Sequence, residues 1–307
     1  NIEAAIRALG MDASYFRPLD DALRAAHLAA GDLAYGMAKR SGARQGVRVS
    51  GRFDSRNPRA EQLLRMWSSD RVVQITDRAR EGVRTSLAAA LEAGTSPRAA
   101  ALDLVGRVGP SGARTGGIVG LDSTKATYVS NMRRELTQLD NSYFTRTLRD
   151  RGFDGVVRRA IAQGTPLSAA QVTSITNRYS GRLVRLRGEA IARTELLGSV
   201  HAAQDEGLQQ LTDSGQVRQQ DVQETWDASA DMFTRDDHRN ADNQRVTRGQ
   251  PFMIVGYAMR YPGDTALGAP AEQVINCRCV KRVDIDFLAG LPGRLTPEQL
   301  ARARAEL

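Results

Sequence analysis

Cysteine, lysine, aromatic residues and long apolar runs are all scarce in this 307-residue chain. No apolar run approaches the roughly 18 residues of a membrane-spanning helix, so we expect no transmembrane segment. The first residues contain an early acid, Glu3, and no apolar core, so we expect no secretory signal there. The two cysteines, Cys277 and Cys279, would lie on one face of a strand without easy disulfide geometry. Free thiols and assembly in a reducing cytoplasm are therefore expected.

The scarcity of lysine means that almost all of the positive charge is arginine. Only three of the 43 cationic residues are lysine, against 35 acidic residues, and the formal net charge is +8. A guanidinium group binds phosphate or carboxylate through two parallel hydrogen bonds, so this composition suits a polyanion or an acidic partner. A GC-rich genome that encodes arginine in place of lysine is the alternative cause.

The excess of positive charge is concentrated between residues 133 and 193. This segment holds twelve arginines and five acidic residues, a net charge of +7, and the rest of the chain supplies only +1. Such a field concentrates anions, although a solvated helix face is the alternative. Aromatic residues are too few here for stacking on single strands, so we expect phosphate contacts that read no sequence. The candidate contacts to DNA or an acidic partner are Arg133, Arg134, Arg146, Arg149, Arg158, Arg159, Arg178, Arg182, Arg185 and Arg187.

Helical periodicity dominates the first two-thirds of the chain. Helical patterns cover residues 18–39 and 58–91, each begun by a proline and stopped by a glycine. Helices resume at residue 123 and end with a long pattern over 181–211. Trp67, His27 and His201 fall on or beside the apolar stripes, which predicts packed core side chains.

Residues 109–120 interrupt the helices with five glycines and one proline. The spacing of Gly116, Gly117 and Gly120 differs from that of a phosphate-binding loop, and no Gly-Lys-Ser/Thr follows, so we expect a flexible joint. After residue 215 short strand patterns cover 222–226, 252–255, 257–260 and 280–287, with a further one at Val246. Thr296 and Gln299 have the spacing of a capping box at the start of a last helix.

These patterns predict an α+β protein with a mostly α-helical N-terminal two-thirds and a small α+β C-terminal module. The expected segments are an N-terminal helical region (1–108), a glycine-rich joint (109–120), a basic helical region (121–215), the α+β module (216–287), and a linker with the C-terminal helix (288–307).

The C-terminal module holds one group of residues with metal-binding chemistry. Thiolate, imidazole and carboxylate are the usual zinc ligands, so His238, Cys277 and Cys279 are candidates for zinc. The alternative is that both cysteines pack inward while Arg278 points outward to an acid such as Asp231. A Cys279 nucleophile activated by His238 lacks an identifiable third group. We expect no catalytic residue and no cofactor, with zinc as the open alternative.

The chain resembles the phage head morphogenesis family, the minor head proteins similar to the F protein of phage Mu. The matching blocks span 191–195, 231–235, 242–244, 259–264 and 272–279, and the motif residues are Arg193, Thr194, Glu195, Trp226, Asp231, Arg235, His238, Asn276, Cys277, Arg278 and Cys279. Upstream blocks near residues 52–60, 116–121 and 153–161 also look like the family. Phe233 and Asn243 depart from it, since Arg and Gly are commoner there.

The resemblance implies a low-copy virion protein of the capsid interior, near the portal, that is assembled in the host cytoplasm. The implied partners are the portal protein, the major capsid or scaffolding protein and packaged double-stranded DNA, with no membrane. The resemblance implies that the protein is not an enzyme and that the motif residues hold the fold of the module. The alternatives are an ADP-ribosyltransferase- or nuclease-like module with Glu195 or Asp231 in a deep pocket, or a zinc-stabilised structural module.

Overall fold

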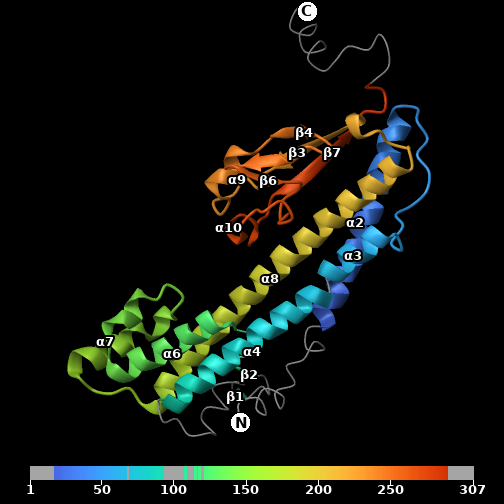
Figure 1. The fold of residues 1–307 in the computed structure, drawn as a ribbon. Coiled ribbons are helices and arrows are strands. Elements are labelled where there is room, and N and C mark those ends of the chain that lie inside the picture. The colour runs from blue at the N-terminus through green and yellow to red at the C-terminus, as the bar shows by residue number, and fades with distance from the viewer. Residues whose placement is uncertain are drawn as a thin grey trace, which may run out of the picture. The chain divides into compact units, whose positions relative to one another are not determined.

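The computed structural model describes residues 17–67, 69–92, 107–108, 114–115, 117–118 and 121–289. The chain divides into two compact units (Figure 1). Unit 1 is Asn1–Pro18 with Asp70–Ala190, and unit 2 is Leu19–Ser69 with Ile191–Leu307. Each unit combines distant parts of the sequence, whereas the five segments expected from the sequence are continuous.

Unit 1 is built from helices. They are α4 (Ser69–Glu92), α6 (Ser123–Gln138), α7 (Asp154–Gln163) and the first part of α8 (Ala169–Asp213), with 3-10 turns at Asn141–Thr145 and Arg151–Phe153. The short strands β1 (Arg107–Val108) and β2 (Arg114–Thr115) pair antiparallel. Helix α6 begins where the Asp122 carboxylate accepts the N–H of Lys125 at 3.0 Å, and it ends at Leu139 in the left-handed conformation.

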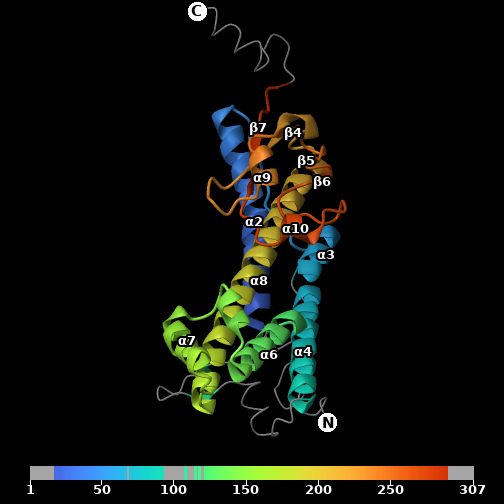
Figure 2. The same cartoon turned by 90° about the vertical axis from the view of Figure 1, so that its left-hand side faces the viewer.

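The core of unit 1 lies between α4, α6, α7 and α8 (Figures 1 and 2). Its largest fully buried side chains include Leu121, Met132, Leu136, Tyr143 and Ile175. Helix α4 approaches the backbone before α6 so closely that a Cβ on Gly82 would lie 2.2 Å from the carbonyl oxygen of Leu121. A glycine is therefore required at this contact.

Unit 2 combines helices from two stretches of the chain with the strands. The helices are α2 (Arg17–Arg44), α3 (Pro58–Trp67), the rest of α8, α9 (Asp236–Asn240) and α10 (Ala271–Val274), with a 3-10 turn at Gln219–Asp221. One antiparallel sheet has the order β4–β3–β7, from β3 (Val222–Asp227), β4 (Arg245–Thr247) and β7 (Val280–Ile285). A separate hairpin pairs β5 (Phe252–Ile254) with β6 (Tyr257–Met259).

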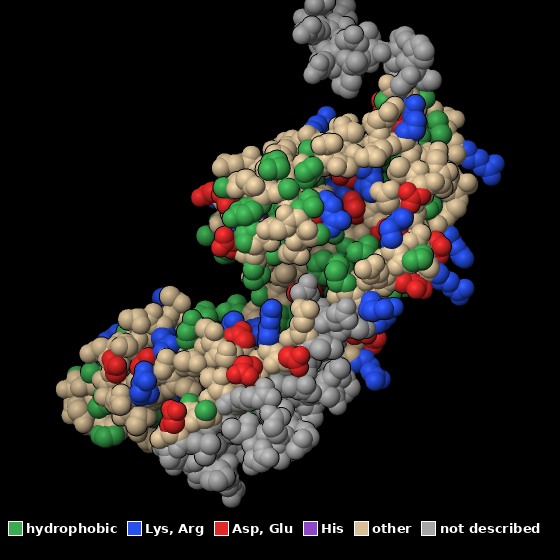
Figure 3. Space-filling model, viewed as in Figure 1, with side chains coloured by type: hydrophobic (Ala, Val, Ile, Leu, Met, Phe, Trp, Pro, Cys, Tyr) green, Lys and Arg blue, Asp and Glu red, His purple; other side chains and the backbone are tan. Residues whose placement is uncertain are grey.

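Two of the three apolar clusters in the described part of unit 2 involve the strands. The first joins Ala34 of α2 and Leu208 of α8 to Val222 and Ile285 at one end of the sheet. The second surrounds Trp226 of β3 and contains Phe252, Cys277 and Cys279. The module around the strands also carries exposed apolar side chains (Figure 3), which are Met232, Phe233, Met253, Val255, Tyr257, Leu267, Ile275 and Val280.

The predicted α+β fold class is confirmed, and the five short strand patterns correspond to β3–β7. Trp67, His27 and His201 are buried as predicted. The pattern over 58–91 forms two helices, α3 and α4, and the long pattern over 181–211 belongs to a helix that already begins at Ala169. Most of the glycine-rich joint and the expected last helix lie outside the described residues.

None of the helices in the described part of the chain is both long enough and apolar enough to cross a membrane.

Candidate functional site

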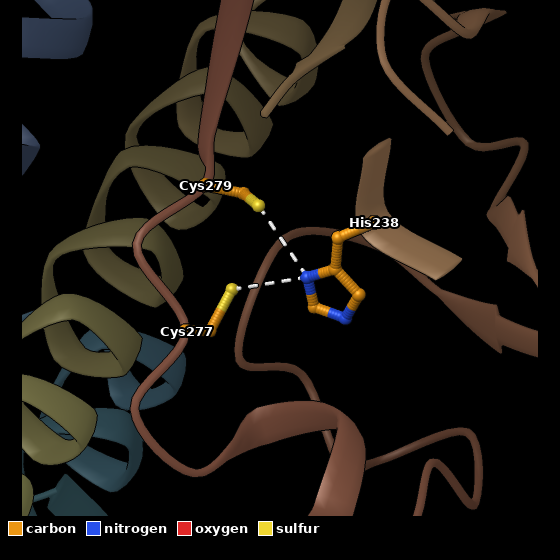
Figure 4. Close-up of side chains that lie close together, drawn as sticks. All are labelled: His238, Cys277 and Cys279. Atoms are coloured by element: carbon orange, nitrogen blue, oxygen red, sulfur yellow. Dashed lines mark hydrogen bonds between the residues drawn. The ribbon is translucent and has the colours of Figure 1, made fainter. Parts of the chain in front are cut away.

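His238, Cys277 and Cys279 converge inside the C-terminal module (Figure 4). His238 comes from α9, and both cysteines lie on the extended run between α10 and β7. The Nδ1 atom of His238 lies 3.5 Å from Cys277 Sγ and 3.4 Å from Cys279 Sγ. All three side chains are buried, and both cysteines are free thiols.

A left-handed turn at Asn276 aims the cysteine run at His238. Asn276 has a φ of 58°, and its backbone N–H donates to Thr194 Oγ1 at 3.0 Å. The side chain of Arg193 donates to Asn276 Oδ1 at 3.3 Å. Two adjacent motif residues, about 80 residues from Asn276 in sequence, therefore fix the turn that precedes Cys277.

Arg235 fixes the other side of the cluster. It is the N-cap of α9, and its guanidinium group donates to the backbone carbonyl of Ile275. This hydrogen bond ties the start of the helix that carries His238 to the end of α10. The motif arginine therefore acts on the position of the imidazole.

Arg278 points away from the cluster, as the inward packing of the cysteines requires. Its Nη2 lies 2.7 Å from Asp231 Oδ1, and its guanidinium carbon lies 5.1 Å from the centroid of the Phe233 ring. The same Asp231 oxygen accepts the backbone N–H of Phe233 at 2.9 Å. The expected pairing of Arg278 with Asp231 is thus present, and it orders the loop before α9.

Two polar side chains, Gln273 and Asp237, determine which nitrogen of the neutral His238 ring carries the proton. The Gln273 amide donates from Nε2 to Asp237 Oδ2 at 3.0 Å, because a carboxylate can only accept. Gln273 Oε1 therefore faces His238 Nε2 at 3.0 Å, so the neutral imidazole carries its proton on Nε2. The Nδ1 lone pair is left facing the two sulfur atoms.

The sulfur atoms of Cys277 and Cys279 belong to the apolar cluster around Trp226 and also face the polar imidazole of His238. The Trp226 ring stands edge-on to His238 at 5.3 Å between centroids. The hydrogen bond from Cys277 lowers the pKa of the Cys279 thiol despite its burial. The hydrogen bond to Cys279 and burial raise the pKa of Cys277. Cys279 is therefore the thiol that ionises first.

Two cavities of unit 2 are lined by other residues than this cluster. A cavity of about 690 Å³ is lined by residues that include Ser41, Arg44, Asp221 and Asp284, and a smaller one of about 340 Å³ by residues that include Arg59 and Tyr261. Neither cavity is lined by Glu195 or Asp231. Glu195 is half-buried on α8 and is not part of the His238 cluster.

Six of the ten arginines expected to contact DNA or an acidic partner form ion pairs with carboxylates of this chain. Arg146 pairs with Glu135 and Arg149 with Asp154, each through two hydrogen bonds. The remaining pairs are Arg178 and Arg182 with Asp150, Arg185 with Glu189, and Arg187 with Asp122. Arg146, Arg149 and Arg187 are at most 14% exposed, so they stabilise unit 1.

The other candidate arginines are placed differently. Arg134 on α6 and Arg158 and Arg159 on α7 are exposed and form no ion pair with the described residues. Arg158 lies over the Phe144 ring at 5.3 Å. Arg133 is half-buried. The exposed positive charge of residues 133–193 therefore comes mainly from arginines without an ion pair in the described part of the chain and from Arg178, which is 66% exposed and lies 3.7 Å from Asp150.

The sequence interpretation missed a buried group of four charges. Lys281 Nζ lies 2.8 Å from Asp205 Oδ1 and 2.9 Å from Glu224 Oε1. Arg248 Nη1 lies 3.0 Å and 2.9 Å from the same two atoms. A signal existed: residues 281, 283 and 285 alternate inward along β7, so a lysine stands where a buried side chain is expected.

The strands, the helices around them and this cluster form an α+β module, and hydrogen bonds between its own motif side chains hold the cluster in place. Residues 152–282 match the family model described as Phage Mu protein F like protein. The match confirms the resemblance of the chain to the Mu F-like family of phage head morphogenesis. The matched range contains α8, strands β3 to β6, the start of β7 and the His238 cluster. No curated protein and no solved structure gave a match to the chain.

Proposed function

We propose that this protein is a minor head protein of a tailed phage that acts in head assembly from the capsid interior, near the portal. The observation that carries the proposal is the Mu F-like match over residues 152–282, which includes nearly the whole C-terminal module. The portal protein and the major capsid or scaffolding protein are the proposed protein partners.

The bonding of the motif residues supports a structural role. Arg193, Thr194 and Asn276 bond to one another, and Arg278 bonds to Asp231. These side chains form their hydrogen bonds inside the module, and Asp231 lines neither described cavity. Exposed apolar side chains such as Met232 and Phe233 support docking on other head proteins, since such residues mark interaction surfaces when they gather.

The phage that encodes the chain provides the test of this role. Deleting the gene is expected to reduce the number of complete heads, and the wild-type gene in trans restores them. The protein is also expected to remain with portal and shell proteins in particles emptied of DNA. Normal heads in its absence, or a protein found only outside particles, would overturn the proposal.

We further propose that unit 1 contacts the phosphates of packaged duplex DNA through its exposed arginines. The segment 133–193 carries a net charge of +7, and internal ion pairs redistribute this charge without removing it. Arg134, Arg158 and Arg159 are free to meet phosphate oxygens. Phosphate binding releases counterions, so affinity falls with salt by a slope of about −0.9 per contact on duplex DNA.

The double variant Arg158→Gln, Arg159→Gln tests this DNA contact in duplex-binding measurements at several salt concentrations. Loss of two contacts is expected to weaken binding and to reduce the salt slope by about 2. The control Arg52→Gln, Arg56→Gln removes the same charge from exposed positions in unit 2. Equal weakening by both pairs, or binding by the wild type that does not depend on salt, would leave only protein docking.

A further inference from the structure

The three atoms of the His238 cluster have the spacing of ligands around one tetrahedral ion. Zinc bonds of about 2.3 Å to sulfur and 2.0 Å to nitrogen at a tetrahedral angle place sulfur and nitrogen about 3.5 Å apart. The two measured separations from His238 Nδ1 are 3.5 Å to Cys277 Sγ and 3.4 Å to Cys279 Sγ. All three ligand atoms lie within 4.8 Å of one another. Both sulfur–nitrogen separations therefore already match those of a tetrahedral zinc site.

The outer hydrogen bonds of the cluster also have the pattern of a metal site. A metal-bound histidine usually donates its second N–H to an oxygen that fixes the tautomer. His238 does so through Gln273, which Asp237 holds in one orientation. Nδ1 is thereby kept unprotonated and aimed at two thiols. A proton-free nitrogen facing two sulfur atoms in a buried site is suited to a cation.

The donor set selects the kind of cation. Two sulfur atoms and one imidazole favour a borderline-soft ion such as zinc, whereas magnesium and calcium require oxygen ligands. No fourth His, Cys, Asp or Glu among the residues that the structure describes belongs to this cluster. A water molecule would complete the tetrahedron.

The geometry points to a zinc site formed by His238 Nδ1, Cys277 Sγ and Cys279 Sγ. Zinc binding converts both thiols to thiolates and releases their protons to solvent. The ion joins α9 to the run that leads into β7, so it stabilises the module by linking segments about 40 residues apart in sequence. The site does not depend on the proposed role in the phage head.

Metal content and cobalt spectroscopy of the purified full chain test the site. We expect one zinc ion per chain after purification without chelators. After removal of zinc, cobalt(II) is expected to give the thiolate charge-transfer and tetrahedral d–d absorption bands in a one-to-one titration. Cys277→Ser and Cys279→Ser should each lose charge-transfer intensity and retain less zinc.

His201→Gln is the matched control, because His201 is also a buried histidine of unit 2 and its Nδ1 faces the carbonyl of Pro262 at 2.8 Å. This variant is expected to keep one zinc ion per chain. If the cysteine variants fail to fold, a mercurial titration of the wild type decides: two thiols react and one zinc ion is released. Reduced, folded wild type that takes up neither metal, or cobalt bound without thiolate bands, would overturn the site.

Discussion

Replacing Lys281 by methionine breaks the buried group of four charges in unit 2. The Lys281 side chain is fully buried between Asp205 and Glu224, and Arg248 bonds the same two carboxylates. The two cations and two anions balance, and methionine keeps most of the length of the lysine side chain while it removes one positive charge. Arg248 alone then faces two carboxylates, and the group carries an uncompensated negative charge.

The expected loss of unfolding free energy for Lys281→Met is about 3–5 kcal/mol, the usual result of removing one partner of a buried ion pair. The control is Lys125→Met, whose partner Asp122 is its helical neighbour at i−3 and whose ion pair is partly exposed. Such a surface pair contributes at most about 1 kcal/mol. Denaturant unfolding is followed by circular dichroism, because both units contain helices, and by tryptophan fluorescence for unit 2, where both tryptophans lie.

The double variant Lys281→Met, Glu224→Gln tests the charge balance itself. It leaves one cation and one anion, so its loss should be smaller than the sum of the two single losses by about 0.5–3 kcal/mol. Additive losses, or a Lys281→Met loss no larger than that of Lys125→Met, would refute the reasoning.

Two further predictions concern unit 2. Burial alone would raise the pKa of Asp205, but Lys281 and Arg248 lower it from 3.8 to about 2. Its stabilisation is therefore complete above about pH 4 and falls by about 2 kcal/mol as the pH decreases to 2, and acid unfolding curves should show a smaller loss for Lys281→Met. Gly198→Ala would bring a Cβ within 2.3 Å of the Trp67 ring and should lower the free energy of unfolding by about 1–3 kcal/mol. The control Gly188→Ala lies on the same helix, where the added Cβ meets open space, and should raise that free energy by up to about 1 kcal/mol. Thermal unfolding measures both changes. A Gly198→Ala variant as stable as the wild type, or an acid loss unchanged by Lys281→Met, would contradict these assignments.

The cluster of His238 shows how far the sequence reaches toward a site. The residue types alone name three zinc donors, and Arg278 between the cysteines indicates an outward partner. The convergence depends on the left-handed turn at Asn276 and on bonds from Arg193 and Thr194, which lie about 80 residues away in sequence. Gln273 and Asp237 match no ligand pattern, so their effect on the tautomer was not predictable.

The basic segment shows the same limit for charge. Composition locates the +7 excess between residues 133 and 193, and that excess is a property of the sequence. Which guanidinium groups are available depends on packing, because Arg187 is buried against Asp122 while Arg158 and Arg159 remain exposed on α7. Charge counts give the sum, and only the fold assigns it to a surface.

Local sequence patterns were sufficient to predict the α+β class, the start of α3 at Pro58 and the five strands β3 to β7, because periodicity, proline and turn residues act over a few neighbouring positions. The discontinuous units, the burial of Lys281 and the meeting of His238 with Cys277 and Cys279 became visible only in the folded chain. These contacts join residues far apart in the chain, and their geometry follows from the packing of whole elements. Local patterns carry no record of that packing.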